Sequence, residues 1–237
     1  LNPNLNEQEV MEEHGKNPLA YHRIDEKLVP SDIKFGKLTV SLDLSGEKTS
    51  GVVALQARKN PEPIDMSKIR SEVAEDYFEP VISKSCKFVS VPGKYYLLST
   101  RELLVIPRHL SAELKSVHTS GIHGIWDFAG FIGNCFRGNL VFESRSDETD
   151  LAPLEHGLEV SVLDVFRCRE EADKGDGKQS FSNYQGQERL RVSKNFALFD
   201  FKTAGKEYNQ LDRVVLVEEK NKLLGLRGNN EGFEFIE

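Results

Sequence analysis

Short strand-like segments separated by turn residues are the feature that most limits what this chain can fold into. Residues 38–44 alternate apolar and polar side chains with a period of two, which is typical of a half-buried strand. Further segments of this kind are 51–57, 94–100, 102–107, 139–143 and 159–167. Helical patterns are sparse between residues 78 and 196, so the sequence favours a β-sandwich or barrel over a parallel α/β sheet.

Two helices are predicted before this β-rich region. Residues 6–15 can form one, because Asn6 can cap it, acidic residues occupy its first turn and Gly15 can end it. Residues 67–77 can form the other, with apolar residues roughly on one face. The chain therefore combines many strands with a few short helices.

The sequence predicts three parts. Residues 1–50 are expected to be an N-terminal arm or the remnant of a preceding domain, residues 51–205 the β domain, and residues 206–237 a C-terminal β extension. In that extension, residues 213–219 are predicted to form a strand and residues 223–227 its hairpin partner.

Composition excludes some classes of partner. Lys and Arg number 31 and Asp and Glu 38, which gives a formal charge of −7 and argues against binding DNA, RNA or acidic membranes without sequence preference. No apolar run approaches the roughly 18 residues of a membrane helix, so a cytoplasmic protein is expected. An anionic substrate would need a local basic cluster, for which Arg189, Arg191 and Lys194 are candidates; a solvated charged strand is the alternative.

Common catalytic and metal-binding motifs are absent from the sequence. Cys86, Cys135 and Cys168 lie far apart, so free thiols are expected rather than disulfides or a Cys-x-x-Cys metal site. His118 and His123 flank a loop and either contact phosphate or are solvated, since no second ligand stands at metal spacing. Phosphate loops, nucleophile elbows and dinucleotide fingerprints do not occur, which disfavours kinases, serine hydrolases and dinucleotide enzymes.

Glu143 is the leading candidate for a catalytic residue. Alternation after Gly138 places Asn139, Val141 and Glu143 on one face of a strand. A carboxylate beside apolar neighbours can be partly desolvated, which raises its pKa and suits it to proton transfer near neutral pH. Just upstream, the glycines of residues 129–133 let the backbone approach a ligand closely.

Structural alternatives remain open at this point. Glu143 can instead form an ion pair with Arg145 or Arg137, with the glycines serving only to make a turn. Trp126 can stack on a base or belong to the core.

Five ordered motifs resemble those of the dCTP deaminases, in the dUTPase-like superfamily. They are Pro-Gly-Lys-Tyr-Tyr-Leu-Leu-Ser-Thr-Arg-Glu at 92–102, Ile-Pro at 106–107, Ala-Gly-Phe-Ile at 129–132 with Gly138 and Glu143, His-Gly at 156–157, and Ser-Asn-Tyr-Gln-Gly-Gln at 182–187 with Val-Ser-Lys-Asn-Phe at 192–196. More narrowly, the chain resembles the C-terminal half of the two-domain bacterial form, over about residues 51–196.

The resemblance implies a mainly β protein with the β-clip or dUTPase-like distorted jelly-roll barrel and a few short helices. It also implies a homotrimer or trimer-like assembly with active sites between subunits, and hydrolytic deamination of dCTP to dUTP and ammonia without zinc. Mg²⁺ would arrive bound to the triphosphate of the deoxynucleotide. The His-x-Glu and Pro-Cys-x-x-Cys motifs of zinc deaminases are indeed absent from the sequence.

The roles of single residues follow from the same resemblance. Glu143 matches the catalytic glutamate, Ser116 a serine that helps to polarise the site, and Ala129 an alanine whose carbonyl helps to hold the attacking water. The substrate-binding residues implied are Gly130, Phe131, Ile132, Tyr184, Gln187 and Lys194.

Two positions depart from the family pattern. Ser120 stands where single-domain members carry an arginine, and Gly133 stands where an aspartate would bind the deoxyribose 3′-hydroxyl. Both motivate a second hypothesis, in which a β-clip domain has lost catalysis and serves as a nucleotide-sensing or assembly module.

Overall fold

The computed structural model describes residues 4–34, 36–59, 62–117, 125–127, 130–146, 152–171, 183–210, 226–229 and 232–235. Its first elements are α1 (Glu7–Lys16), β1 (Ala20–Ile24), β2 (Lys27–Pro30), β3 (Leu38–Asp43), the 3-10 turn η1 (Glu47–Thr49), β4 (Val52–Ala57), α2 (Ala74–Tyr77), β5 (Phe78–Ile82), β6 (Lys87–Ser90) and β7 (Tyr95–Val105). Then follow β8 (Leu110–Ser116), β9 (Ile125–Asp127), β10 (Phe131–Ile132), β11 (Arg137–Ser146), β12 (Ala152–Glu155), β13 (Glu159–Arg167), α4 (Phe201–Gln210), β14 (Leu226–Asn229) and β15 (Gly232–Phe235).

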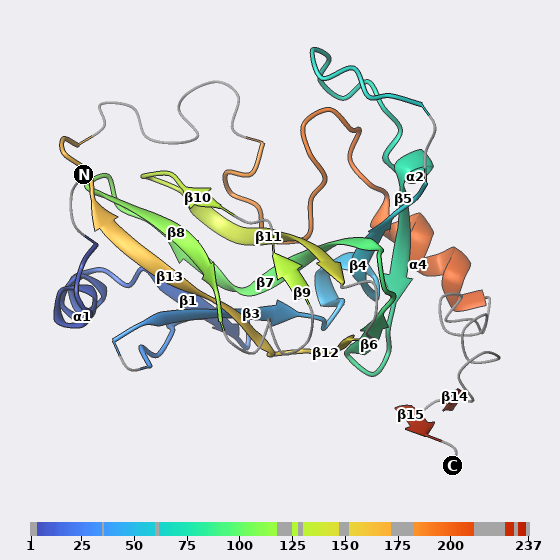
Figure 1. Ribbon diagram of the computed structural model, residues 1–237, viewed down its shortest axis with the longest axis horizontal. Helices are drawn as coiled ribbons and strands as arrows, with labels where there is room; N and C mark the ends of the chain where they lie inside the picture. Colours follow the sequence, from blue (N-terminus) through green and yellow to red (C-terminus); the bar gives the residue numbers. More distant parts are fainter. Residues whose placement is uncertain are drawn as a thin grey trace.

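One large curled sheet organises the described residues (Figure 1). Its main path runs β10-β8-β13-β3-β7-β1-β2, and β7 also pairs with β11 and β4. The pairs are antiparallel, as expected for short strands joined by turns. Strands from both sides of residue 50 belong to this sheet, because β1 and β3 hydrogen-bond to β7. The mainly β fold with a few short helices is thus confirmed.

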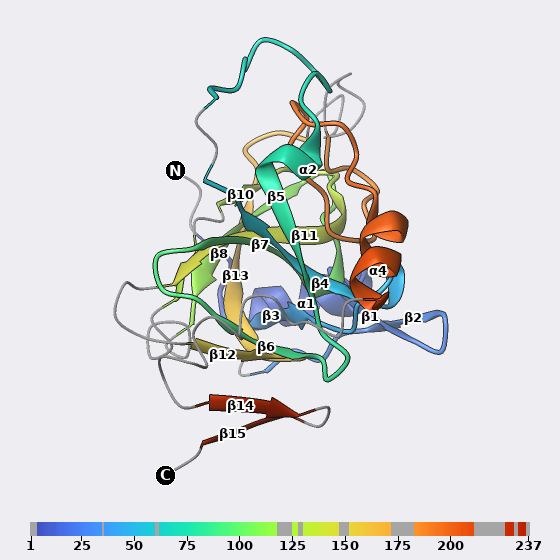
Figure 2. The same ribbon diagram turned by 90° about the vertical axis from the view of Figure 1, so that its right-hand side faces the viewer.

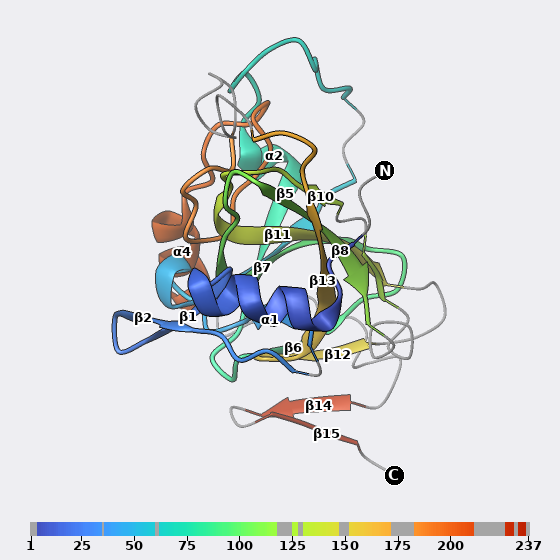
Figure 3. The ribbon, with the colours of Figure 1, turned by 90° about the vertical axis from the view of Figure 1, so that its left-hand side faces the viewer.

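The predicted N-terminal helix is confirmed as α1. Asn6 caps it: the side chain of Asn6 accepts a hydrogen bond from the Glu9 amide, and the side chain of Glu9 accepts one from the Asn6 amide. The helix continues through Gly15 to Lys16 rather than ending at Gly15. Figure 3 shows α1 lying along one side of the sheet, where Val10 is buried in the core.

The predicted helix over residues 67–77 is wrong, because only residues 74–77 are helical. The preceding backbone is instead hydrogen-bonded to a distant part of the chain: the Asn195 side-chain amide donates to the carbonyls of Met66 and Lys68. Ile69 and Val73, on the expected apolar face, are 54% and 53% exposed. Tertiary hydrogen bonds therefore replace the bonds within a helix.

The C-terminal part contains a helix that the sequence analysis missed. α4 (Phe201–Gln210) follows Asp200, whose carboxylate accepts hydrogen bonds from the Lys202 and Thr203 amides, as an N-cap does. Figure 2 shows α4 alongside β4. The predicted strand 213–219 lies outside the described residues, and β14 pairs with the downstream strand β15, so the described hairpin is not the predicted one.

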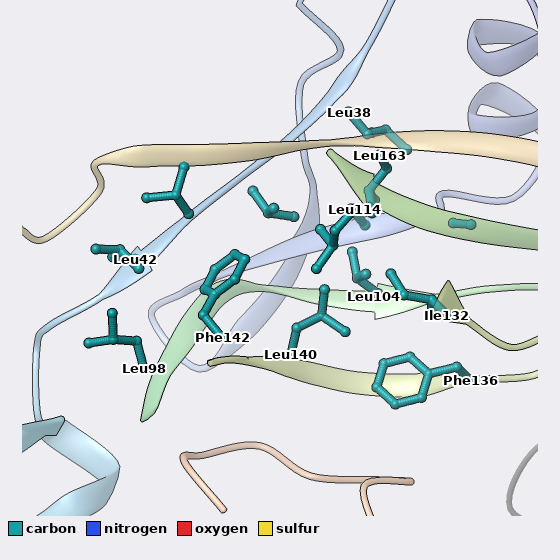
Figure 4. Packing of buried hydrophobic residues seen from close by; sticks show 14 of the residues in the cluster. Leu38, Leu42, Leu98, Leu104, Leu114, Ile132, Phe136, Leu140, Phe142 and Leu163 are labelled. Atoms are coloured by element: carbon teal, nitrogen blue, oxygen red, sulfur yellow. The ribbon is translucent and has the colours of Figure 1, made fainter. Parts of the chain in front are cut away.

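Two apolar clusters form the core. The first fills the inside of the curled sheet and includes the residues labelled in Figure 4. The second lies between β4, β7 and the chain after residue 190; its members include Leu55, Leu97, Leu190, Val192 and Phe196. β11 contributes to both clusters, because Leu140 and Phe142 are buried in the first while Val141 packs on the second. The predicted alternation is confirmed for Leu140, Val141 and Phe142, whereas the pairing with β7 shifts its register between Asn139 and Val141.

Other expectations from composition can be compared with the described residues. The three cysteines are free, as predicted. No helix in the described part of the chain is long and apolar enough to cross a membrane.

Candidate active site

β11 and β7 together position Glu143. Glu143 pairs with Leu97 across the two strands, and Arg145 pairs with Tyr95. Tyr95 is therefore the diagonal neighbour of Glu143 on the same face of the sheet. Its phenol donates a hydrogen bond to Glu143 Oε2 over 3.2 Å. The carboxylate is thus held by a neutral donor from the neighbouring strand.

Glu143 is exposed in the single chain. The face that carries it also carries Val141, which packs against the second apolar cluster. The described residues therefore place an apolar neighbour beside Glu143, as predicted, but they do not remove its side chain from solvent.

Tyr184 lies close to Glu143. Its ring is half-buried and packs against the first apolar cluster. Burial raises the pKa of the Tyr184 phenol, and the negative charge of Glu143 raises it further. Tyr184 is therefore a neutral phenol within electrostatic reach of Glu143, and Tyr95 is the phenol that donates a hydrogen bond to its carboxylate.

The segment that carries Tyr184 is docked on the start of β11. The Asn139 amide donates to the Gln187 carbonyl over 2.9 Å, and the Gly186 amide donates to the Arg137 carbonyl over 2.7 Å. Gln187 is 1% exposed, and its side-chain amide donates to the Asn139 carbonyl over 2.5 Å. A Cβ on Gly138 would lie 3.0 Å from the Gln187 carbonyl oxygen, so this contact requires glycine.

The other predicted site residues occupy several places in the sheet. Ser116 is exposed at the end of β8, opposite Ser161. Gly130 accepts a hydrogen bond from the Leu114 amide, and β10 follows it, with Phe131 68% exposed and Ile132 buried in the first cluster.

Among the remaining candidates from the sequence, the structure describes Lys194 and the backbone of Trp126. Lys194 is exposed in the segment after residue 189. The backbone of Trp126, in β9, pairs with Arg145, so β9 runs beside the end of β11 that follows Glu143. Ala129, Ser120, His118 and His123 lie outside the described residues.

A hollow in the structure includes Arg189, one of the candidates for a basic cluster, but none of the site residues that the resemblance implies. It is lined by Asp43, Gly46, Glu47, Lys48, Thr49, Val52, Val53, Ser99, Arg189 and Leu190. Glu143 does not line this hollow; it is exposed and accepts its hydrogen bond from Tyr95.

Tyr95 and Arg70 were not identified from the sequence. Tyr95 belongs to a quoted motif, but its bond to Glu143 depends on the register between β7 and β11, for which the local sequence carries no signal. Arg70 lies in the segment expected to be helical. Its charge contributes to lowering the pKa of Arg191, after burial and the charge of Arg189.

A solved structure has the same fold. The crystal structure of 2′-deoxycytidine 5′-triphosphate deaminase from Agrobacterium tumefaciens superposes with a TM-score of 0.63 at 22% sequence identity, over 72% of this chain and 50% of that one. The curled β architecture described above is therefore that of a dCTP deaminase.

The family follows from a match over most of the sequence. The family model described as "2'-deoxycytidine 5'-triphosphate deaminase (DCD), C-terminal domain" matches residues 6–196. This chain belongs to that family.

Curated relatives share about a third of their residues with the chain in the aligned part. The dUMP-forming dCTP deaminase of Leifsonia xyli is 31% identical over 115 residues, which are 47% of this chain and 57% of the relative. That of Corynebacterium glutamicum is 33% identical over 116 residues, which are 47% of this chain and 61% of the relative. The dCTP deaminase of Haloarcula marismortui is 28% identical over 128 residues, which are 52% of this chain and 64% of the relative. The aligned part thus spans less than two thirds of each relative.

Proposed function

We propose that this chain catalyses the hydrolytic deamination of dCTP to dUTP and ammonia. The observation that carries the proposal is the exposed, hydrogen-bonded carboxylate of Glu143, the residue that the sequence resemblance matches to the family's catalytic glutamate. Its carboxylate accepts a hydrogen bond from Tyr95 and lies near the phenol of Tyr184. Membership of the deaminase family and the names of the curated relatives support the choice of reaction.

In the proposed reaction, a water attacks C4 of the cytosine ring while Glu143 accepts one of its protons. Glu143 then delivers that proton to N3 of the ring. The C4–N4 bond breaks, the amine leaves as ammonia with the second proton of the water, and the water oxygen becomes O4 of uracil. Tyr95 binds Oε2 of the carboxylate, which leaves Oε1 available for the water. Ser116 polarises the site, and the Ala129 carbonyl holds the water.

The proposal includes no zinc. Its support is the sequence, which lacks the two motifs that hold zinc and its water in the zinc deaminases. Mg²⁺ is proposed to enter with the nucleotide, bound by phosphate oxygens and its own waters, which are the ligands that this ion favours. The described residues hold no group of three or more His, Cys, Asp or Glu side chains that could bind a metal ion.

A homotrimer with sites between subunits is part of the same proposal. The exposure of Glu143 in the single chain supports it, because a proton carrier works best where bulk water is excluded. A neighbouring subunit over this face would supply that exclusion. Some relatives are named dUMP-forming, so the product, dUTP or dUMP, must be determined as well.

Glu143→Gln tests the proposal, because it keeps the shape of the side chain and removes the proton carrier. We expect ammonia release from dCTP to fall by about 10²- to 10⁴-fold while calorimetry still detects nucleotide binding. The matched control is Glu155→Gln, which changes an exposed glutamate that pairs with Lys87 on a surface strand pair.

Chromatography of the products separates dUTP from dUMP in the same assay. Turnover that survives in Glu143→Gln would refute the role of this residue. Wild-type protein that binds dCTP but releases no ammonia would instead favour the nucleotide-sensing or assembly module.

A further inference from the structure

Strand β7 carries a bulge opposite the first half of β11. Asn139 of β11 pairs with Leu103, whereas Val141 pairs with Ser99. The two residues of β11 are two positions apart and their partners are four apart, so β7 holds two extra residues within the segment 100–102. Bulges of this kind re-aim the side chains that follow them in an antiparallel pair.

Two buried side chains hold the bulge against β11. The side-chain amide of Asn139 donates to the Thr100 carbonyl over 2.8 Å and to the Glu102 carbonyl over 3.2 Å, and it lies 3.4 Å from the Arg101 carbonyl. The hydroxyl of Thr100 donates to the Glu102 carbonyl over 2.9 Å and accepts a bond from the Leu140 amide over 2.9 Å. Side chains therefore bind backbone groups that the irregular pairing removes from the strand ladder.

A buried carboxylate fixes the bulge on its other side. The side chain of Glu102 is buried, and its carboxylate accepts bonds from the Ser41 amide over 2.8 Å and from the Ser41 hydroxyl over 2.7 Å. His22 Nδ1 of β1 lies 3.7 Å from Glu102 Oε1. The bulge is thus tied to β3 through Glu102 and to β11 through Thr100 and Asn139.

The bulge changes which residues meet across the strands without changing the face that each occupies. Two residues are one full period of a strand, and Leu98 before the bulge and Leu104 after it both belong to the first apolar cluster (Figure 4). Regular pairing continued from the start of β11 would put Glu143 opposite Ser99 instead of Leu97, about 7 Å away along β7. The alternation of apolar residues is the same in both alignments, so it cannot choose between them.

The choice of alignment decides which side chain lies beside Glu143. In the observed alignment Tyr95 is its diagonal neighbour and donates a hydrogen bond to it. In the regular alignment Tyr95 would lie about 13 Å along β7 from the residue opposite Glu143, beyond hydrogen-bond reach, and Arg101 would be a diagonal neighbour instead. A nearby arginine favours the charged form of a carboxylate and so disfavours the protonation that a proton carrier needs.

We propose that Thr100 and Asn139 are positioning residues for the carboxylate of Glu143. By holding the bulge, they select the alignment in which Tyr95, and not Arg101, is the neighbour of that carboxylate. The effect on turnover rests on the proposed function; the alignment itself does not.

Thr100→Val tests the proposal, because it keeps the size of a buried side chain and removes the hydroxyl that joins the two strands. We expect kcat for dCTP to fall by about threefold to tenfold with little change in KM, as expected for loss of the Tyr95 donor. Thr100→Ser keeps the hydroxyl and should keep kcat within about twofold of wild type. The matched control is Thr49→Val, the same substitution at a buried threonine whose hydroxyl donates to the Val52 carbonyl of β4; its kcat should also stay within about twofold.

A double-mutant cycle separates positioning from a general loss of stability. If Thr100→Val acts by separating Tyr95 from Glu143, adding Tyr95→Phe should lower kcat by less than about twofold more. Urea denaturation shows whether each variant is folded under the assay conditions, and Asn139→Ala provides the same cycle if Thr100→Val does not fold. Additive losses of kcat, or an unchanged kcat in the folded variant, would overturn the proposal.

Crystal structures of the wild type, Thr100→Val and Thr100→Ser report the alignment without substrate. We expect the hydrogen bond from Tyr95 to Glu143 to be lost in Thr100→Val and kept in Thr100→Ser. Its presence in Thr100→Val would overturn the proposal. Wild-type protein that releases no ammonia from dCTP would refute the proposed function, while these structures would still decide whether Thr100 sets the alignment, so the two failures can be told apart.

Discussion

Gly138→Ala should disconnect the segment that carries Tyr184 from β11. The added Cβ would lie 3.0 Å from the Gln187 carbonyl oxygen and 3.2 Å from its amide nitrogen, both backbone atoms that cannot rotate away. If Gly186 and Gln187 move away from β11, their three hydrogen bonds are lost: the two backbone bonds to Arg137 and Asn139, and the bond from the Gln187 side chain to Asn139. The two bonds that the Gln185 side chain makes to Arg137 and Cys135 are not counted in this loss. At about 0.5–1.5 kcal/mol each, the free energy of unfolding should fall by about 1.5–4.5 kcal/mol.

Urea denaturation followed by tryptophan fluorescence and circular dichroism measures this loss. The matched control is Gly186→Ala in the same segment, because Gly186 has a φ of 70° but no atom within 4 Å of the added Cβ. The control carries the strain of a left-handed residue, about 1–2 kcal/mol, without the close contact. If Gly138→Ala proves no more destabilising than Gly186→Ala, then the contact between Gly138 and Gln187 does not hold the segment in place.

Two further predictions concern carboxylates. A hydrogen bond from His109 lowers the pKa of the buried Glu13 carboxyl below its usual value of 4.5. The stability that the charged Glu13 adds to the folded state is therefore fully present above about pH 4.5 and is lost as pH falls through the lowered pKa. Wild-type protein should therefore lose stability below pH 4.5 more steeply than Glu13→Gln in urea denaturation; parallel pH curves would contradict this. Tyr95→Phe removes the donor to Glu143 and should lower kcat for dCTP by about threefold to tenfold with little change in KM, and an unchanged kcat would exclude a positioning role.

Local sequence signals account for the elements that were predicted correctly. The cap of α1 is specified within four residues by Asn6 and Glu9, and the faces of β11 follow from simple alternation. The local signal for α4 was also present, in Asp200 followed by Thr203, and was overlooked. These features require no knowledge of distant contacts.

The features that could not be predicted depend on long-range contacts. Residues 67–73 carry a helical apolar pattern, but Asn195, more than 120 residues later, donates to the Lys68 carbonyl and accepts from the Ser71 amide. The partner of Glu143 depends on how β7 and β11 align, and that alignment shifts between Asn139 and Val141. The Arg70 amide bonds to the Lys194 carbonyl only because these two distant parts of the chain pack together. Local patterns thus located the candidate carboxylate but not the groups around it.

The alternation that builds the core also fixes the direction of Glu143. A slip of one residue along β11 would remove Phe142, 2% exposed, from the first apolar cluster and turn Glu143 into that cluster. Losing the buried phenylalanine would cost up to about 1.5–3 kcal/mol, and burying an unpaired carboxylate would add several more. The packing of Leu140 and Phe142 therefore keeps the carboxylate on the side of the sheet that carries Tyr95, so the residues that stabilise the fold also orient the candidate catalytic group.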